Sequence, residues 1–465
     1  MKIHWKTLAM TAAAVNILCF SGCKAAQSIP ASAEDLAETT KNIKISQKAA
    51  SGTTSNTSGT SFSDARKITP AGAYELSGGS AAKKGEQLTA TGENKSAVLV
   101  KNSGKLSGEE LEITCSSKTT SNEESLKFGL GAALLADSSA NVELKKGSVS
   151  SAGGYCAAVF ATGISANISL SGTKTSSAGE SAPAIGASRG GFISAVECEI
   201  SSTGANAPAV FAGDKNSTIS VLSGKISAQG TNAPAVLSKG MVNINSAAVD
   251  SKGVIASIDA GEATFTAVTA TGAAENGIEL FSSGKAAVPS SFTMNSGSLK
   301  NSGERLFYVT NSKASIYLNN VSTDESQQVL LLSEAGKYGE ENKNGGQAVF
   351  SAGGCRLFGE IKCDMFSTVD IELKNGSVFK GAVNSVCSAK EARLEIDAGS
   401  TWELTADSYL TVFRDYLSQL TNIKDNGFSI YYDKDNKEND WLEGKTIPLP
   451  GGGKITPDLS RGQST

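Results

Sequence analysis

The 465-residue sequence contains a single histidine, His4, which lies among its first few residues. The rest of the chain therefore lacks the one side chain whose unperturbed pKa lies close to neutral pH. Enzymes that transfer protons at neutral pH use histidine more often than any other residue. This absence counts against acid–base catalysis and leaves pairs of carboxyl groups as the main catalytic candidates.

The chain also lacks an excess of positive charge. It has 42 Lys and Arg against 46 Asp and Glu, which gives a formal net charge of −4. Nucleic-acid binding needs a basic surface, so we expect no nucleic-acid partner. Beyond Cys23 there is no apolar run of the roughly 18 residues that a membrane-spanning helix needs. The sequence therefore predicts no transmembrane helix.

The N-terminus has the pattern of an export signal. The basic stretch MKIHWK leads into the run LAMTAAAVNILCF, which carries no charge. This run is too short for a transmembrane helix and is typical of the apolar region of a signal peptide. The next residues, FSGC (Phe20–Cys23), resemble the lipobox of bacterial lipoproteins, although Phe20 stands where leucine is more usual.

The lipobox resemblance implies a signal peptide over residues 1–22 and a diacylglycerol on Cys23, with an acylated amino group. Several acyl chains on one residue would anchor the protein to a membrane. The alternative is an ordinary signal peptide with an incidental Cys23. Residues 23–65 are rich in Ser, Thr, Ala and Lys and have too few large apolar side chains to fold. We expect them to be a lipidated flexible tether.

Cysteine usage leaves the redox state open. Of eight cysteines, Cys19 and Cys23 lie at the N-terminus. The other six are Cys115, Cys156, Cys198, Cys355, Cys363 and Cys387. An even number permits disulfides in an exported protein, but the spacing specifies no pairing. Free cysteines, buried as small apolar side chains, are an equally good interpretation.

An internal repeat runs through the middle of the chain. GANAPAVFAG (204–213) has near-copies that begin at Gly179 and Gly230. Larger apolar residues recur 25 or 26 apart at Val142, Ile168, Ile193 and Ile219. Companion positions follow each of them after steps of 7, 7 and 3 residues, as in Ile193, Ile200, Ala207 and Val210. The same steps return at Phe292, Leu299, Leu306 and Val309. A fixed period of this length indicates a solenoid.

The short repeated runs are rich in Ile, Val, Ser and Thr and are separated by Gly or Asn, which favours strands and turns over helices. Three strands in each repeat predict an all-β parallel β-helix over residues 66–400. Pro183, Pro208 and Pro234 would lie where strands begin. The pattern resembles right-handed parallel β-helix proteins, namely pectin-lyase-like folds and the passenger regions of bacterial adhesins. Residues 119–131 and 333–347 break the period and are expected to be protruding loops.

Residues 401–465 depart from the repeat and are expected to cap the open end of the solenoid. Leu410, Phe413, Leu417 and Leu420 recur at helical spacing and predict a short helix within residues 406–420. A binding subdomain is the alternative. The nearby stretch DKDNKEND (433–440) resembles a calcium loop only in Asp433 and Asp435. Its later positions carry Lys437, Glu438 and Gly444 where that loop needs other residues, so we expect no metal and no cofactor. Weak calcium binding by Asp433 and Asp435 is the alternative.

The regular repeats contain no cluster of aspartates. Glu197 and Glu199 are the best acidic pair and are expected on one strand face. The repeat aligns Lys174, Glu199 and Lys225, which predicts a charge ladder across neighbouring coils instead of a catalytic pair. The same alignment places Val210 in the interior.

These features predict a non-enzymatic, adhesin-like surface lipoprotein of the bacterial cell envelope, which its lipid would bind to an outer membrane where the cell has one. The exposed Ser, Thr, Asn and Lys side chains would bind a glycan or a protein, and we expect a monomer. A polysaccharide lyase or hydrolase on the same fold is the first alternative, and a structural spacer is the second.

Overall fold

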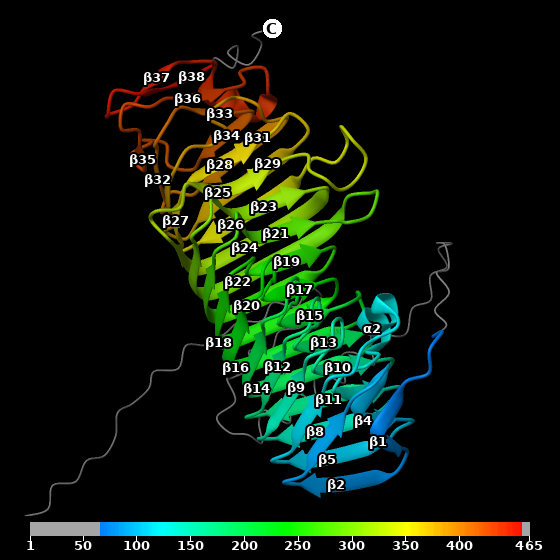
Figure 1. Ribbon diagram of the computed structural model, residues 1–465. Coiled ribbons are helices and arrows are strands. Elements are labelled where there is room, and N and C mark those ends of the chain that lie inside the picture. Colours follow the sequence, from blue (N-terminus) through cyan, green and yellow to red (C-terminus); the bar gives the residue numbers. More distant parts are fainter. Residues whose placement is uncertain (1–65, 458–465) are drawn as a thin grey trace, which may run out of the picture. The chain divides into compact units, whose positions relative to one another are not determined.

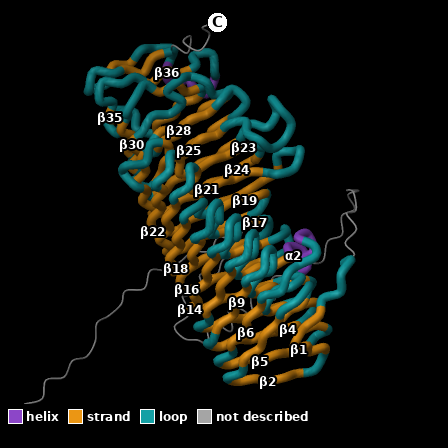
Figure 2. The backbone as a smooth tube through the Cα atoms, in the orientation of Figure 1, coloured by secondary structure: helices purple, strands orange, loops and turns teal. Residues whose placement is uncertain are grey.

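The computed structural model describes residues 66–457, drawn as ribbon and tube in Figures 1 and 2. The expected signal peptide, the tether and Cys23 lie outside the described residues, as do residues 458–465. The described part is an all-β solenoid of about 15 turns that follow one another about 25 residues apart. The predicted parallel β-helix is therefore confirmed.

Twelve successive turns each contribute one strand to a parallel sheet of 12 strands. Its members, in spatial order, are β1 (Ala71–Ser77), β4 (Lys95–Lys101), β7 (Leu134–Asp137), β10 (Val159–Thr162), β13 (Ile185–Ser188), β15 (Val210–Ala212), β17 (Val236–Ser238), β19 (Ala256–Asp259), β21 (Asn276–Phe281), β23 (Arg305–Thr310), β25 (Val329–Ser333) and β28 (Glu360–Cys363).

The other two sides of each turn form a sheet of 22 strands. The early turns give it separate pairs: β2 (Ser80–Lys84) and β3 (Gln87–Ala90), β5 (Lys105–Glu109) and β6 (Glu112–Cys115), β8 (Asn141–Lys145) and β9 (Ser148–Ser151), β11 (Asn167–Ser171) and β12 (Lys174–Ser177). In the middle turns each pair is one long strand: β14 (Phe192–Ser202), β16 (Thr218–Ala228), β18 (Met241–Ser251), β20 (Glu262–Gly272), β22 (Val288–Asn301) and β24 (Ser312–Thr323). The late turns divide again: β26 (Gln347–Gly353) and β27 (Arg356–Phe358), β29 (Thr368–Lys374) and β30 (Val378–Lys380), β31 (Glu391–Ile396) and β32 (Thr401–Glu403), β34 (Val412–Asp415) and β35 (Ile423–Lys424).

The predicted repeat register is confirmed strand by strand. Val142, Ile168, Ile193 and Ile219 are successive Cα partners in β8, β11, β14 and β16. Ile185, Val210 and Val236 are partners in the same way in the 12-stranded sheet. All of these side chains are fully buried. Stacking each apolar residue on its equivalent in the next turn builds one continuous core, which is the main source of stability in a solenoid.

The APAV phrase is explained by close packing at one corner of the turn. A Cβ atom on Gly204 would lie 1.9 Å from the carbonyl oxygen of Gly179, and one on Gly230 would lie 1.8 Å from that of Gly204. Only glycine fits so close an approach of backbones. Pro208 lies two residues before β15, and its carbonyl accepts a hydrogen bond from the Ala184 N–H of the previous turn. Proline needs no donor there, so its missing N–H costs nothing.

Two expected loops have different outcomes. Residues 334–346 contain no helix or strand and connect β25 to β26, as predicted. Residues 119–131 instead contain the helix α2 (Asn122–Phe128), which begins at a Ser121 cap and ends at left-handed Gly129. Phe128 is buried, and the buried Glu124 carboxylate accepts hydrogen bonds from the N–H groups of Lys67 and Ile68. This segment is therefore packed on the solenoid rather than protruding freely.

The predicted helix within residues 406–420 is wrong. These residues form β33 (Ser408–Leu410) and β34, with a turn at Thr411 between them. Leu410 and Phe413 are both buried because they point to the interior from two different sheets, and this geometry mimics helical spacing. The short helix of the C-terminal region lies later, as the 3₁₀ helix η1 (Lys437–Leu442).

Parallel stacking continues beyond residue 400. A third sheet of four strands contains β33, β36 (Ile430–Tyr432), β38 (Lys454–Thr456) and β37 (Ile447–Pro448) in spatial order. The last pair is antiparallel, and Ile455 and Leu449 are buried beneath it. This sheet and η1 cover the C-terminal end of the stack, labelled at the top of Figure 1. All six cysteines within the described residues are free thiols, and only Cys387 is not buried.

Candidate functional site

The acidic residues singled out from the sequence do not form a catalytic pair. Glu197 has left-handed backbone dihedrals (φ 54°) and occupies the corner within β14, so it does not share a flat strand face with Glu199. Glu199 is the Cα partner of Lys174 and Lys225 in the neighbouring turns, and Lys174 Nζ lies 3.1 Å from its carboxylate. The predicted ladder register is confirmed.

Asp433 and Asp435 lie in the turn that leads into η1. The Asp433 carboxylate accepts a hydrogen bond from the N–H of Asp435, and Asn436 caps the helix. Across residues 66–457 there is no group of three or more His, Cys, Asp or Glu side chains that could hold a metal ion. The carboxylate geometry here is that of a local turn.

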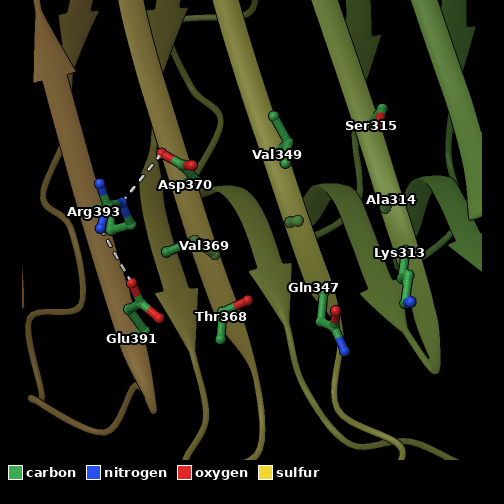
Figure 3. Close-up of a pocket in the computed structure, with 11 residues that line it drawn as sticks. Lys313, Ala314, Ser315, Gln347, Val349, Thr368, Val369, Asp370, Glu391 and Arg393 are labelled. Carbon is green, nitrogen blue, oxygen red and sulfur yellow. Dashed lines mark hydrogen bonds and ion pairs between the residues drawn. The ribbon is translucent and has the colours of Figure 1, made fainter.

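A hollow on the outer face of the 22-stranded sheet brings together residues that sequence analysis did not connect. It has a volume of about 290 Å³ and crosses β24, β26, β29 and β31 (Figure 3). Its lining consists of Lys313, Ala314, Ser315, Gln347, Ala348, Val349, Thr368, Val369, Asp370, Glu391 and Arg393. We call this surface the flank groove.

The strand register arranges the outward side chains of the flank groove in three columns. The first contains Lys313, Gln347, Thr368 and Glu391. The second contains Ser315, Val349, Asp370 and Arg393, and the third contains Tyr317, Ser351, Glu372 and Glu395. Alternate residues of each strand point outward, while Val369 and Ile371 between them are buried in the core. Figure 3 shows the first two columns side by side across the four strands.

Arg393 is the electrostatic centre of the groove. Its guanidinium donates to both carboxylate oxygens of Glu438 at 2.7 and 2.5 Å, and Glu391 and Asp370 lie 3.4 and 3.9 Å from it. Glu438 belongs to η1, so this bidentate pair ties the C-terminal cap to the edge of the groove. The Glu438 carboxylate raises the pKa of Arg393, and Arg393 lowers that of Glu438.

Two carboxyl groups on β29 have environments that shift their pKa values in opposite directions. Partial burial raises the pKa of Asp370, and the nearby carboxylates of Glu395 and Glu391 add to the rise while Arg393 opposes it. Glu372, two residues away, has a lowered pKa because Lys374 lies 2.6 Å from its carboxylate and Ser351 donates to it at 2.7 Å. Such divergence between neighbouring carboxyl groups is a feature of acid–base pairs.

Apolar surface lies beside these polar groups. Val349 is 43% exposed within the groove, and Tyr317, in the third column, is 42% exposed. Donors, acceptors and an exposed ring thus occupy one face. Sequence analysis missed this face because its strands are separated by loops of unequal length. The alternation in TVDIELK (368–374) was the one available signal that Asp370 and Glu372 point outward together.

Comparisons of the chain with protein-family models, with curated proteins and with solved structures give no match. None of the helices in residues 66–457 has the length and apolar character required to cross a membrane.

Proposed function

We propose that this protein is a non-enzymatic, lipid-anchored binding protein of the bacterial cell envelope that holds a glycan chain in the flank groove. The observation that carries the proposal is the ordered array of outward side chains over β24, β26, β29 and β31, with an exposed tyrosine beside it. Neighbouring strands are spaced by about 4.8 Å, so a linear polymer laid along the stack would meet a new row of side chains at every turn.

The chemistry of the groove suits a glycan. Lys313 and Arg393 donate hydrogen bonds, Asp370 and Glu391 accept them, and Gln347 does both, which matches hydroxyl groups that are donor and acceptor at once. The ring of Tyr317 offers an apolar face with a polar tip. The groove is open on the solvent side, so a long chain needs no free end to enter it.

Binding is tested by applying the protein to an array of glycans and matrix proteins, with calcium present and absent. We expect saturable binding to one glycan class and at least a tenfold loss of affinity in Tyr317→Ala. Asn243→Ala is the matched control, because Asn243 occupies the same outward column in β18, three turns earlier. Equal affinities of the two variants would place the ligand elsewhere on the solenoid.

The lipid anchor is tested separately in cells that express the full-length chain and are fed a fatty acid carrying an alkyne tag. We expect the label in the wild-type protein and in Cys19→Ser, and none in Cys23→Ser. Cys19 is the matched control because it lies four residues earlier in the same N-terminal segment. Retention of the label in Cys23→Ser would rule out the anchor at that residue.

A second candidate is hydrolysis of the bound polysaccharide, which the opposite pKa shifts of Asp370 and Glu372 favour. In that mechanism the protonated Asp370 would be the acid and the ionised Glu372 the base or nucleophile. Incubation with each bound polysaccharide, followed by measurement of chain length and new reducing ends, separates the two functions. Shortened chains from wild-type protein and intact chains from Asp370→Asn would establish the enzyme.

A further inference from the structure

The two ends of the described solenoid differ in how far other segments cover them. At the C-terminal end, η1 and the four-stranded sheet cover the last turn. At the other end, β1, β2 and β3 form the first described turn, at the bottom of Figure 1. Among the described residues each of these strands pairs on one side only, with β4, β5 and β6. Within residues 66–457 the other edges of these strands have no strand partner, and such edges template the addition of strands from another chain.

The apolar core reaches this open turn without being closed. Tyr74, Leu76, Ala81 and Leu88 pack against the core and are only partly buried. In the next turn their Cα partners Val98, Val100, Leu106 and Ile113 are all buried. An exposed end with both apolar side chains and free strand edges is a strong association surface.

One charged residue interrupts that surface. Lys83 occupies an interior position, because its Cα partners in the following turns are Gly108, Leu144, Leu170, Ala195 and Val221. Its side chain is only 18% exposed. The ammonium group lies 4.5 Å from the centre of the Tyr74 ring and 2.6 Å from the Glu86 carboxylate. The lysine thus lies across the apolar end of the core.

We propose that Lys83 keeps the protein monomeric by preventing its open N-terminal end from pairing with a second copy of the chain. Two-fold docking of this turn on its counterpart would bring two ammonium groups into one apolar interface. Each ammonium group would enter together with its Glu86 partner, and removing such an ion pair from water is expensive even while its two members stay together. Inward-pointing charges are a recognised way of blocking edge-to-edge association of sheets.

Because the C-terminal end is covered, removal of the Lys83 charge should give dimers and not longer polymers. Only one association surface per molecule is released, so pairing must use the same surface on both copies. Such an isologous contact closes on itself and gives dimers, whereas a head-to-tail contact would give open-ended fibres.

The test is sedimentation velocity on the full-length chain carrying Cys23→Ser, which cannot take the proposed lipid, with wild-type Lys83 and with Lys83→Leu. We expect a monomer for the wild type and about twice its mass for the variant. Lys84→Leu is the matched control, since Lys84 is the next residue of β2 but is outward-facing, 64% exposed and paired with Glu109. It should stay monomeric, as should Lys83→Arg, which keeps the charge.

A second variant, Lys83→Ala, removes the charge without adding volume and guards against misfolding of Lys83→Leu. The circular dichroism spectrum and melting temperature establish which variants are folded. A folded Lys83 variant that stays monomeric at every concentration would overturn the proposal. Polymers longer than dimers would also overturn it, because they require pairing through the covered end.

Discussion

The turns between Val142 and Ser251 and those between Ala263 and Phe413 share one backbone framework but fill it differently. In the earlier turns the interior consists mainly of Ala, Val and Ile. In the later turns it contains large rings, all with at most 1% exposure: Phe265, Phe292, Phe307, Phe350, Phe379, Trp402 and Phe413. The parallel ladders fix the spacing of the turns, while the volume of each interior layer is free to vary.

Two of these rings have a small neighbour on the interior face of the same strand. Ala263 is adjacent to Phe265 in the interior face of β20, and Ala352 has the same relation to Phe350 in β26. The rings also contact one another from turn to turn, with centroid distances of 5.2 Å for Phe265–Phe292 and 5.8 Å for Phe292–Phe307. One backbone framework therefore accepts interior layers of different volume while the rings stay in contact from turn to turn.

The largest expected effect is that of a charge placed in the earlier interior. Val210→Asp puts a carboxylate at a position with 0% exposure and no polar partner. We expect a loss of about 4 kcal/mol or more in the free energy of unfolding, because an unpaired buried charge is among the costliest substitutions. Thermal unfolding followed by circular dichroism measures it. Ser220→Asp, on the outward side of β16, is the control, and equal melting temperatures would contradict the interior placement.

The earlier and later turns can be compared directly by shortening one buried side chain of each kind at the same column. Phe292 and Ile219 belong to the same column, three turns apart. We expect Phe292→Ala to cost about 3–5 kcal/mol and Ile219→Ala to cost less within the range of about 2–5 kcal/mol, since the ring leaves the larger cavity. Urea denaturation of both variants gives the difference. A smaller loss for Phe292→Ala would mean that the later turns collapse around the cavity.

The later turns also depend on a polar cap at their end. The buried Asp425 carboxylate accepts hydrogen bonds from the N–H groups of Gly451 at 2.8 Å and Gly453 at 2.7 Å. Burial by itself would raise the pKa of Asp425, but these donors outweigh it and the pKa is lowered. In Asp425→Asn, an amide NH₂ would face one of these two N–H donors, so one hydrogen bond is lost. We expect the free energy of unfolding to fall by about 1–3 kcal/mol at neutral pH.

The lowered pKa fixes the pH dependence of that loss. A carboxyl group whose pKa is lower in the folded state stabilises the fold above its unfolded pKa of about 4. On acidification the unfolded chain takes up the proton first, so the stabilisation disappears as pH falls through the folded pKa. Melting temperatures of wild type and Asp425→Asn should therefore begin to converge as the pH falls below about 4, and should meet only below the folded pKa. A constant difference down to pH 2 would contradict the assignment.

A smaller effect is expected from the surface ladder of the earlier turns. Glu199→Lys would align three lysines at positions 174, 199 and 225, replacing one attractive contact by two repulsive ones. Cross-strand pairs contribute about 0.2–1 kcal/mol each. Because Lys174 and Glu199 are 71% and 64% exposed, added salt should screen most of the effect. The measurement is the melting temperature at low and high salt, with Glu199→Gln as the control.

The sequence predicted the structure best where equivalent positions of successive turns carry the same type of residue. The columns through Ile193, Ile200 and Val210 were predictable because each turn repeats an apolar residue at a fixed offset. The helix expected at 406–420 failed because two short strands that face the core from different sheets also place apolar residues three or four apart. The interior position of Lys83 was not predicted either, because in the sequence a lysine in the first turn looks the same as a lysine on the surface.

The flank groove was beyond prediction for a related reason. Asp370 and Arg393 are paired only through the register of β29 with β31, and loops of unequal length separate the turns in that region. Without a fixed period, the sequence gives no alignment of one turn with the next. Sequence analysis therefore found the regular turns and missed the place where irregular turns bring charged residues together.

The smallest expected effect concerns a column of corner residues whose shared backbone conformation cannot be recognised from their amino-acid types. At least one residue per turn has left-handed backbone at the corner of the 22-stranded sheet, among them Gly85, Glu110, Lys146, Gly172, Glu197, Ser223, Ser246, Ala267, Ser296, Asn320, Gly354 and Asn375. Glycine and asparagine suit this conformation, whereas the other side chains adopt it at a cost of about 1–2 kcal/mol. The turn geometry is thus imposed by the stack and not by local preference.

Ala267→Gly tests whether the stack bears that cost. Ala267 is exposed with φ 52°, so glycine relieves the strain and disturbs no packing. Glycine also gains freedom in the unfolded chain worth about 0.5–1 kcal/mol, which leaves an expected net stabilisation of about 0.5 kcal/mol. Ala248→Gly is the control, because Ala248 is exposed in β18 with ordinary strand dihedrals and should lose about 0.5–1 kcal/mol. If both substitutions destabilised the protein equally, the backbone at the corner would be unstrained. The hydrogen-bonded strands on either side would then not have to offset any conformational cost of the residues in this column.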